Sequence, residues 1–403
     1  MSLTNYKPQF DNAYEEVFQK ALVAKMIMNT RFEPVLKYGA SIERVSYDIS
    51  GVQVRTVTRG AASTIDSVTD SNELLTVNLE KEAVFHVSDG EATQAGPLNP
   101  GEEIGKQIGI KVAVDLDARC FAEVLNALFN FDTGDLTTLA SNGTPISLSA
   151  TTVPQMVSRM PAKLRYKNFQ EILTNMALVV DSYAASDIAQ YLLGKNIDLA
   201  GYVFKNGYTG DISNAQMYIS ENLTGTAVLT SPQTPSDTDT VTINGVVFTF
   251  NTTLSTNPGS VLISGSADAA RANLAALINA PGTTTTLGTA VSAANQALLA
   301  QTLKLVATNS NSADTLTLVG TGSGRLIISQ VMTNTNNVIT KNYINAYFGK
   351  KGAIDLVIQD IKPVEMLKTT DRRGTNVFSS YLAGIKTFAD GAKKFLNVWI
   401  STT

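Results

Sequence analysis

The sequence predicts an α+β fold, and three observations lead to this prediction. Residues 99–131 form a long run with apolar residues three and four positions apart, which is typical of a helix with a buried face. Residues 41–96 switch to apolar–polar alternation, which is typical of strands. From residue 172 on, the pattern of strand, helix, turn and strand indicates an α+β layer.

The composition is that of a folded protein with unusually few charges. The 403 residues are enough for two or three domains, with 44% hydrophobic and 16% charged residues. So low a charged fraction indicates surfaces that meet other protein. The net charge of -4 and the lack of a dense Lys/Arg run predict no general attraction to nucleic acid, so any contact with DNA would be local.

The single cysteine and the single histidine limit the chemistry that the chain can perform. Cys120 cannot form an internal disulfide, and a buried apolar thiol is favoured over a nucleophile. The common zinc sites need more ligands of these types, and a hydrolytic triad would have to use His86, which lies in a strand-like run. We therefore predict no catalytic, cofactor-binding or metal-ligating residue and no enzyme, although carboxylate-only chemistry stays open.

Targeting signals are not apparent. The N-terminus lacks the apolar core of a secretory signal, and no window approaches 18 uncharged apolar residues. We expect a protein made in the cytosol, without a membrane partner.

The first hundred residues are predicted to contain an arm, a helix and a hairpin. Residues 1–10 form the arm, and a helix follows from Asp11 to near Arg31. Residues 41–96 form a long two-stranded hairpin with a polar tip. Because an isolated hairpin is marginally stable in water, we expect it to lie on a neighbouring subunit, while packing on its own chain remains the alternative.

The helix predicted over residues 99–131 would be roughly 45 Å long. Its start has Asn99 as cap, Pro100 at the first helical position and Glu102 completing a capping box. The glycines at positions 101, 105 and 109 are expected to permit bending or a close approach. Asp115 and Arg119, four residues apart, either pair or stay solvated.

Residues 132–223 are predicted to form a loop and then a compact region. We expect a helix over residues 151–163, interrupted by Pro154 and Pro161, and a buried strand over residues 172–180. A helix capped by Ser182 should follow, and then a short strand at residues 216–220.

Between residues 224 and 338 the composition shifts to Thr, Ser, Asn, Gly and Ala. The charged residues there are Asp237, Asp239, Asp268, Arg271, Lys304, Asp314 and Arg325. We expect a hairpin turning at Asn244-Gly245, a helix over residues 266–280, and three further strands. The glycine-rich run at 320–325 is predicted to be a hairpin turn and not a phosphate loop. An inserted β-rich domain is the simplest explanation.

The earlier pattern returns after Lys341. Strands are predicted at residues 354–365, 376–387 and 396–401, with Arg372 and Arg373 in an exposed turn. These strands should pair with strands that precede residue 224 and so close a sheet across the insertion.

This order of segments resembles the major capsid (coat) protein of tailed bacteriophages, which has the Hong Kong 97-like fold. NGYTGDISNAQMYISENL at residues 206–223 is similar to the family's glycine turn, strand and Ser-Glu-Asn-Leu-like end. Residues 355–400 are similar to its C-terminal strands, with Leu-Ala-Gly-Ile where the family often has Tyr-Gly.

The resemblance implies a division of the chain into named parts. They are the N-terminal arm and helix (1–40), the extended hairpin loop (41–98), the spine helix, peripheral domain and first part of the axial domain (99–223), the inserted domain placed as in the podovirus coat branch (224–338), and the remaining axial and peripheral strands (339–403).

The resemblance also implies a function in self-assembly. Hexamers and pentamers of the chain would close an icosahedral shell around double-stranded DNA, which the inner face would contact without sequence specificity. Portal and scaffolding proteins, and an auxiliary head protein, would be further partners, with assembly in the host bacterial cytoplasm and a final location in the virion. An adhesin-like or tail-associated binding protein is the alternative, suggested by the Thr- and Ser-rich residues 224–338.

Overall fold

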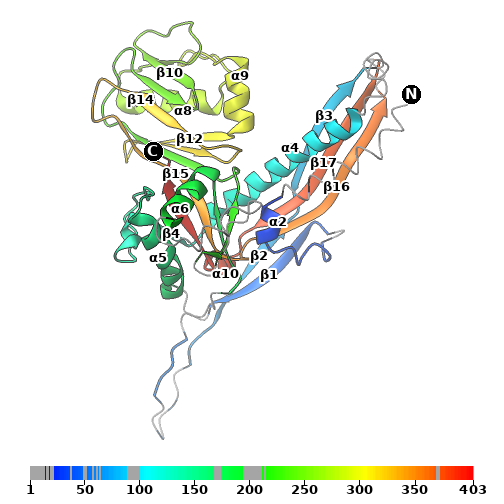
Figure 1. Cartoon of the computed structure of the whole chain (residues 1–403). Helices are drawn as coiled ribbons and strands as arrows, with labels where there is room; N and C mark the ends of the chain where they lie inside the picture. The colour runs from blue at the N-terminus through cyan, green and yellow to red at the C-terminus, as the bar shows by residue number, and fades with distance from the viewer. Residues whose placement is uncertain are drawn as a thin grey trace. The chain divides into compact units, whose positions relative to one another are not determined.

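The computed structural model describes residues 14, 18, 22–36, 39–48, 52–56, 59, 62, 65–88, 100–167, 174–193, 211–212, 215–368 and 373–402. It confirms the α+β class, with helices and several sheets (Figure 1). The chain divides into two compact units, and the boundary between residues 112 and 113 falls inside one long helix. The first unit comprises residues 1–18, 28–112 and 352–392, and the second comprises 19–27, 113–351 and 393–403.

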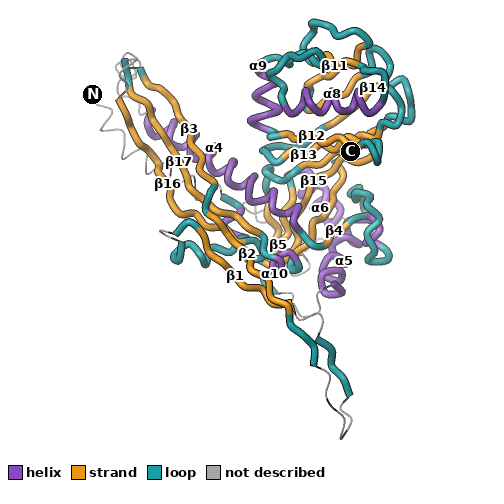
Figure 2. The backbone as a smooth tube through the Cα atoms, turned by 180° about the vertical axis from the view of Figure 1, so that it is seen from behind, coloured by secondary structure: helices purple, strands orange, loops and turns teal. Residues whose placement is uncertain are grey.

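The first unit contains two small sheets. Its elements are β1 (Ser41–Asp48), β2 (Thr69–Thr76), β3 (Leu79–Val87), the first part of α4 (Pro100–Ala122), β16 (Asp355–Lys368), β17 (Thr375–Lys386) and α10 (Ala389–Ala392). Strands β1 and β2 form an antiparallel pair, as the hairpin pattern predicts, but the prediction that residues 41–96 form one two-stranded hairpin is wrong, because β3 belongs to another sheet. The second sheet has the order β16-β17-β3, so β3 pairs with strands near the C-terminus (Figure 2).

The second unit is built on a nine-stranded sheet with the order β12-β13-β8-β15-β5-β7-β6, in which β18 pairs with β15 and β4. The strands of this sheet are β4 (Phe129–Phe131), β5 (Met176–Val180), β6 (Asp211–Ile212), β7 (Ala215–Ile219), β8 (Gly225–Thr230), β12 (Leu305–Ser310), β13 (Thr315–Gly320), β15 (Val338–Lys350) and β18 (Phe395–Ser401). A separate four-stranded sheet has the order β11-β10-β9-β14 and comprises β9 (Thr240–Ile243), β10 (Val246–Asn251), β11 (Ser260–Leu262) and β14 (Ile328–Val331).

The helices of the second unit are mostly short. They are α2 (Ala24–Ile27), the 3-10 helices η2 (Glu123–Asn126) and η3 (Thr133–Leu136), α5 (Thr152–Lys167), α6 (Ser182–Leu193), α8 (Ala267–Asn279), α9 (Ala293–Gln296) and the π-helix η4 (Ala297–Thr302).

The sheets join segments from both ends of the chain, as predicted. β17 pairs with β3 over the register from Thr375 with Val87 to Ala383 with Leu79. β18 pairs in parallel with β4. Both pairings connect strands after residue 338 to strands before residue 224. Pro363 lies where the β16–β17 register shifts, which is a position that tolerates a residue without an N–H.

β15, which has a central position in the large sheet, was not predicted from the sequence. It pairs with β8, β5 and β18, and its residues from Asn342 to Gly349 are buried. Strands covered on both faces lose the apolar–polar alternation, so the run YINAYFG does not show the strand period. Because β8 and β15 pair, residues on the two sides of the predicted boundaries at 224 and 338 share one sheet.

The long helix is shorter than predicted. α4 ends at Ala122 instead of Phe131, the chain continues as a 3-10 turn, and Ala127 adopts an extended conformation with φ -58° and ψ 135°. Residues 129–131 then pair with β18. Leu125 and Leu128 continue the apolar spacing of the helix, but the pairing of the following residues with β18 prevents the helix from extending through them. Asn99 lies outside the described residues. Within the polar stretch of residues 59–73, where the hairpin tip is predicted, residues 69–73 belong to β2, and residues 60, 61, 63 and 64 lie outside the described residues.

Three local predictions were also wrong in detail. The helix expected from Asp11 to Arg31 is broken, because residues 22 and 23 are not helical and α2 ends at Ile27. α5 runs uninterrupted to Lys167: Pro154 stands in its first turn, where no N–H bond is needed, and Pro161 is accommodated inside. α6 is capped by Asp181, not Ser182, since the Asp181 carboxylate accepts the Ala184 N–H at 2.9 Å.

The pattern read for residues 224–338 is largely confirmed. β9 and β10 form a hairpin whose turn residues, Asn244 and Gly245, have φ of 46° and 85°, the left-handed values that an Asn-Gly turn supplies. α8 and β12, β13 and β14 also lie where predicted. The run at 320–325 is not a hairpin turn, because β13 and β14 belong to different sheets. A side chain at Gly322 would collide with the backbone of Thr302 and Leu303, so this glycine allows a close crossing.

Candidate assembly surfaces

The hairpin of the first unit presents two unlike faces. Alternate residues of β1 and β2 point to the same side, and the register pairs Ile42 with Leu75 and Arg44 with Glu73. Leu75 is fully buried in a cluster with residues of β16 and the segment before α10. This face, formed by Ile42, Arg44, Glu73 and Leu75, is the inner face of the hairpin.

The inner face is fixed by apolar and polar contacts together. The cluster comprises Leu36, Leu75, Val77, Val357 and Phe388, with Phe32, Ile42 and Leu382 packed against it. The Arg44 guanidinium contacts the Asp390 carboxylate at 2.5 Å and lies over the Phe388 ring at 5.1 Å. The Glu73 carboxylate accepts the Ala389 N–H at 2.9 Å. The base of the hairpin therefore packs on its own chain.

The outer face of the same hairpin is open. Val45 and Leu74, which alternate with the inner residues, are 43% and 52% exposed. Beyond the paired strands the chain continues as two arms, residues 52–56 and 65–68, in which Val54 is fully exposed and Ile65 is 92% exposed. Exposed apolar side chains thus gather on the outer face and on both arms, which makes this part of the hairpin a candidate contact surface.

The two arms are connected to each other by charge. Arg55 contacts both carboxylate oxygens of Asp66 at 2.7 Å, and the Gln53 N–H donates to Asp66 at 2.9 Å. The Arg55 guanidinium, with this N–H, holds the pKa of Asp66 below its ordinary value. The described residues of the arms form no sheet pairing with each other. The bidentate ion pair therefore aligns the two arms in place of backbone hydrogen bonds.

The long helix α4 permits a close approach at one of its predicted glycines. A Cβ at Gly109 would lie 2.9 Å from the Tyr14 carbonyl oxygen, and Tyr14 itself is fully buried and stacks on Phe18. The prediction of a close approach is therefore confirmed at this position. Ile110, on the neighbouring side of the helix, is 45% exposed and adds an apolar side chain to the surface.

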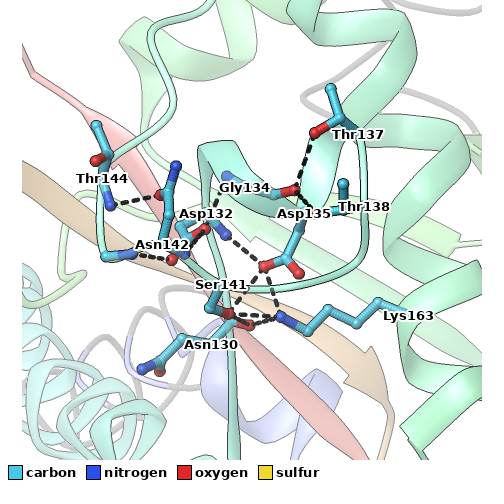
Figure 3. Close-up of polar contacts among 11 residues, drawn as sticks. Asn130, Asp132, Gly134, Asp135, Thr137, Thr138, Ser141, Asn142, Thr144 and Lys163 are labelled. Carbon is cyan, nitrogen blue, oxygen red and sulfur yellow. Dashed lines mark hydrogen bonds and ion pairs between the residues drawn. The ribbon is translucent and has the colours of Figure 1, made fainter.

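The loop that follows β4 is held closed by a buried polar cluster (Figure 3). The Asp132 carboxylate accepts three backbone N–H groups, from Gly134 at 3.0 Å, Asn142 at 3.0 Å and Gly143 at 2.7 Å. Asp135 reciprocally accepts the Asp132 N–H and completes a capping box. The loop is thereby shaped by two carboxylates that are fully buried.

Lys163 of α5 supplies a positive charge to one of these carboxylates, that of Asp135. Its Nζ contacts Asp135 Oδ2 at 2.5 Å and the Ser141 hydroxyl at 2.8 Å, and it also donates to the Asn130 carbonyl. A buried ion pair is tolerated when its remaining hydrogen-bond capacity is used, as it is here for the ammonium group. We interpret the cluster as a structural clamp, which the sequence analysis did not find because its partners come from three separate segments.

The residues considered for chemistry are not assembled into a reaction centre. His86 of β3 lies opposite Asn376 of β17, with its Nδ1 2.7 Å from the amide oxygen. Cys120 is fully buried, and burial raises the pKa of its thiol well above the ordinary value. Asp115 and Arg119 do pair, at 3.0 Å, and Lys304 also contacts Asp115.

Among the described residues, no group of three or more His, Cys, Asp or Glu side chains is arranged to hold a metal ion. Within the same part of the chain, no helix is long and apolar enough to span a membrane.

Comparisons with known proteins identify similar structures but no similar sequences. No family model matches the chain. No curated protein matches it either. The structure resembles one from Mycobacterium phage Che8, with 14% identity, a TM-score of 0.47, and coverage of 93% of this chain and 90% of that one.

Two further similar structures are the capsid of cyanophage P-SCSP1u and a virus-like particle from Pyrococcus furiosus. The first has 10% identity, a TM-score of 0.45, and coverage of 91% of this chain and 84% of that one. The second has 10% identity, a TM-score of 0.40, and coverage of 96% and 97%. Since these TM-scores lie below 0.5, the function of the chain has to be argued from its own residues.

Proposed function

We propose that this chain is a major capsid protein, which self-assembles into the icosahedral head shell of a tailed bacteriophage around double-stranded DNA. The observation that carries the proposal is the divided hairpin. Its inner face is anchored on its own chain, while its outer face and arms expose apolar side chains. An extended element of this kind is complete only when a second copy covers it.

The resemblance drawn from the segment order supports the same proposal. The described elements follow the expected order of hairpin, long helix, sheet with strands from both chain ends, and a β-rich region. In such a shell each chain contributes several modest interfaces, whose energies add over many copies. The low charge of the chain suits surfaces that face other protein.

We propose further that residues 224–338 form an inserted domain. A hydrophobic cluster that runs from Ala227 to Ile328 lies entirely within this segment, and among the described residues outside the segment Ile339 alone packs against it. Portal and scaffolding proteins, an auxiliary head protein and packaged DNA are the proposed partners, with the virion as the final location and the host cytoplasm as the place of assembly.

Expression of the chain alone tests the function. Electron microscopy and sedimentation should show shells, tubes or capsomers of megadalton scale. A stable monomer or trimer that binds glycans would instead support the adhesin-like alternative and overturn the capsid proposal.

A second experiment tests the divided hairpin directly. Val54→Asp and Ile65→Asp place a charge on arms that are exposed in the single chain, so folding should be unchanged. Each buried apolar side chain contributes about 2 kcal/mol to an interface, so assembly should be lost. Val247→Asp is the matched control, because this β10 valine is 47% exposed outside the hairpin. Normal particles from both hairpin variants would contradict the role of the arms.

A further inference from the structure

The strand β14 forms one edge of the four-stranded sheet in residues 224–338. It pairs with β9, from Ile328 with Ile243 to Val331 with Thr240, and it stands last in the order β11-β10-β9-β14. β15, the next strand along the chain, pairs with β8 instead. Within the part of the chain that the structure describes, no strand pairs with the second side of β14.

The hydrogen bonds to β9 determine which backbone groups of β14 point away from the sheet. The Asn244 N–H donates to the Ile327 carbonyl at 2.8 Å, so Ile327 and every second residue after it direct their backbone groups towards β9. The N–H and C=O groups of Ile328 and Gln330 therefore point to the open side. Such a row of backbone groups accepts another extended strand.

The side chains on the outer face of β14 are exposed and uncharged. Ile327 and Val331 are 57% and 73% exposed, and Ser329 between them is exposed as well. On the same face, the neighbouring strand β9 places Thr242 opposite Ser329 and Thr240 opposite Val331. The outer face at this edge therefore carries no charge that would repel a second uncharged surface.

β14 also lacks the features that usually protect an edge strand from pairing. Residues 326–332 contain no charged residue and no proline, and the register with β9 has no bulge. Arg325, the charged residue just before this stretch, lies over the Tyr183 ring at 5.0 Å. The sequence of β14 therefore suits pairing with another strand better than exposure to water.

The strand is complementary to a second copy of itself that runs antiparallel. In a register centred on Ser329, the backbone groups of Ile328 bond those of Gln330 in the other copy, which are the groups that point to the open side. The same register places Ile327 opposite Val331 twice, so the exposed apolar side chains cover each other. The two Ser329 side chains lie directly opposite each other, and no like charges meet.

We propose that β14 is a docking edge for a second copy of this chain, which pairs antiparallel through residues 326–332 and joins two four-stranded sheets edge to edge. The two copies are related by a two-fold axis at Ser329, so both contribute the same surface. Because β14 has only four residues, the pairing is weak alone and gains strength where other contacts hold the same copies together. It does not require a closed shell.

Disulfide trapping in the full-length chain tests the docking edge. Ser329→Cys places two thiols in a non-hydrogen-bonded antiparallel pair, where the Cα atoms are about 4.5 Å apart and a disulfide fits. Cys120 is buried, so it adds little background. Mild oxidation at several protein concentrations should give a covalent dimer on a non-reducing gel. Val247→Cys is the matched control, because this exposed β10 residue lies in the same row but two strands from the edge.

Two further cysteine variants test the register. Ile327→Cys and Val331→Cys should each dimerise poorly alone, because the proposed register does not bring either residue opposite itself. Co-expression of the two, with tags of different size, should give the mixed dimer. Efficient dimerisation of Ile327→Cys alone would overturn the register. No more dimer from Ser329→Cys than from Val247→Cys, with no mixed dimer, would overturn the docking edge and show that another segment covers β14 or that none does.

Electron microscopy of the same samples separates this inference from the proposed function. Covalent dimers without shells would support the docking edge and count against the capsid proposal. Shells without covalent dimers would overturn the docking edge and leave the capsid proposal standing. Circular dichroism like that of the wild type confirms that each variant is folded, as expected for substitutions at exposed positions.

Discussion

The hairpin of residues 41–76 and the region of residues 224–338 differ in how they bury their apolar side chains. The region 224–338 has its own core, drawn mainly from β8–β14 and α8, although side chains such as Val306, Ile327 and Val331 remain exposed. The hairpin buries one face and leaves Val45, Val54, Ile65 and Leu74 exposed. The comparison shows that one region has a core of its own, whereas the hairpin has only one buried face, and this difference supports the proposal that a second copy covers the hairpin.

The two regions also use their charged side chains differently. In region 224–338, the fully buried Arg271 contacts Asp268 at 3.4 Å and Asp314 at 3.2 Å, and it also bonds Asn309 and the Ser231 carbonyl. Asp239 accepts the Thr333 N–H and hydroxyl. The hairpin instead uses Arg44 and Glu73 to hold its base, and Arg55 and Asp66 to connect its arms.

Deletion of the region 224–338 has the largest expected effect. Removal of residues 224–338 with a short linker also removes β8, which exposes the edge of β15 from Ile339 to Ile344. Removal of residues 231–337 keeps β8, and its ends are already paired, because Thr230 lies opposite Val338. An Asn-Gly linker there can close a hairpin. We expect the shorter deletion to be soluble and able to assemble, and the longer one to be poorly soluble.

Solubility, circular dichroism and electron microscopy of the two deletions provide the measurement. Global unfolding of the 231–337 deletion would show that the region is part of the main core and would contradict an inserted domain. Equal behaviour of both deletions would show that the β8–β15 pairing adds little.

Leu75→Ala should have the next largest effect, because it opens the anchored face of the hairpin. Leu75 is fully buried, and truncation of such a side chain costs about 3 kcal/mol. Leu74→Ala is the matched control, since the adjacent leucine is 52% exposed and should change stability by less than about 0.5 kcal/mol. Denaturant unfolding measures both. Equal losses from the two variants would refute the assignment of inner and outer faces.

Arg271→Met tests the self-contained region. The guanidinium is buried, whereas the Asp268 and Asp314 side chains are 39% and 49% exposed, so water can take over the partners that it leaves. We expect a loss of about 2 kcal/mol, less than for a pair buried on both sides. Arg271→Lys should recover part of this loss. A stability like that of the wild type in thermal unfolding of Arg271→Met would show that the network contributes nothing.

Sequence reasoning predicted the elements whose period is set by a half-buried face. The β9–β10 hairpin and α8 show their apolar alternation or their 3–4 spacing, and their turn and cap residues are local. It failed where tertiary contacts decide the structure. β15 is buried throughout and has no period, and residues 129–131 leave the helical pattern to pair with β18.

The buried polar groups were the least predictable part of the molecule. Asp117, Asp135 and Lys163 look like ordinary helix or loop charges in the sequence. Their roles depend on partners 93, 28 and 33 residues away, which no local pattern reveals. The divided hairpin, by contrast, could be anticipated in part, since its alternation was visible and only the partner of each face was open.

Asp66→Asn should have the smallest effect and sharpens the distinction between the base of the hairpin and its arms. The substitution removes the charge that binds Arg55 across the arms, but the pair is near solvent, where ion pairs contribute little to global stability. We expect an unchanged melting temperature and faster proteolysis within residues 52–68. Since the pKa of Asp66 is lowered in the folded chain, the wild-type arms should loosen in the same way only in acid, as the pH falls below the ordinary aspartate range.

Limited proteolysis at neutral pH provides the measurement, with the Leu74→Ala variant as a control that keeps the charge pair. A change in the melting temperature, or proteolysis that begins in the base of the hairpin, would show that the arms and the base form one cooperative unit.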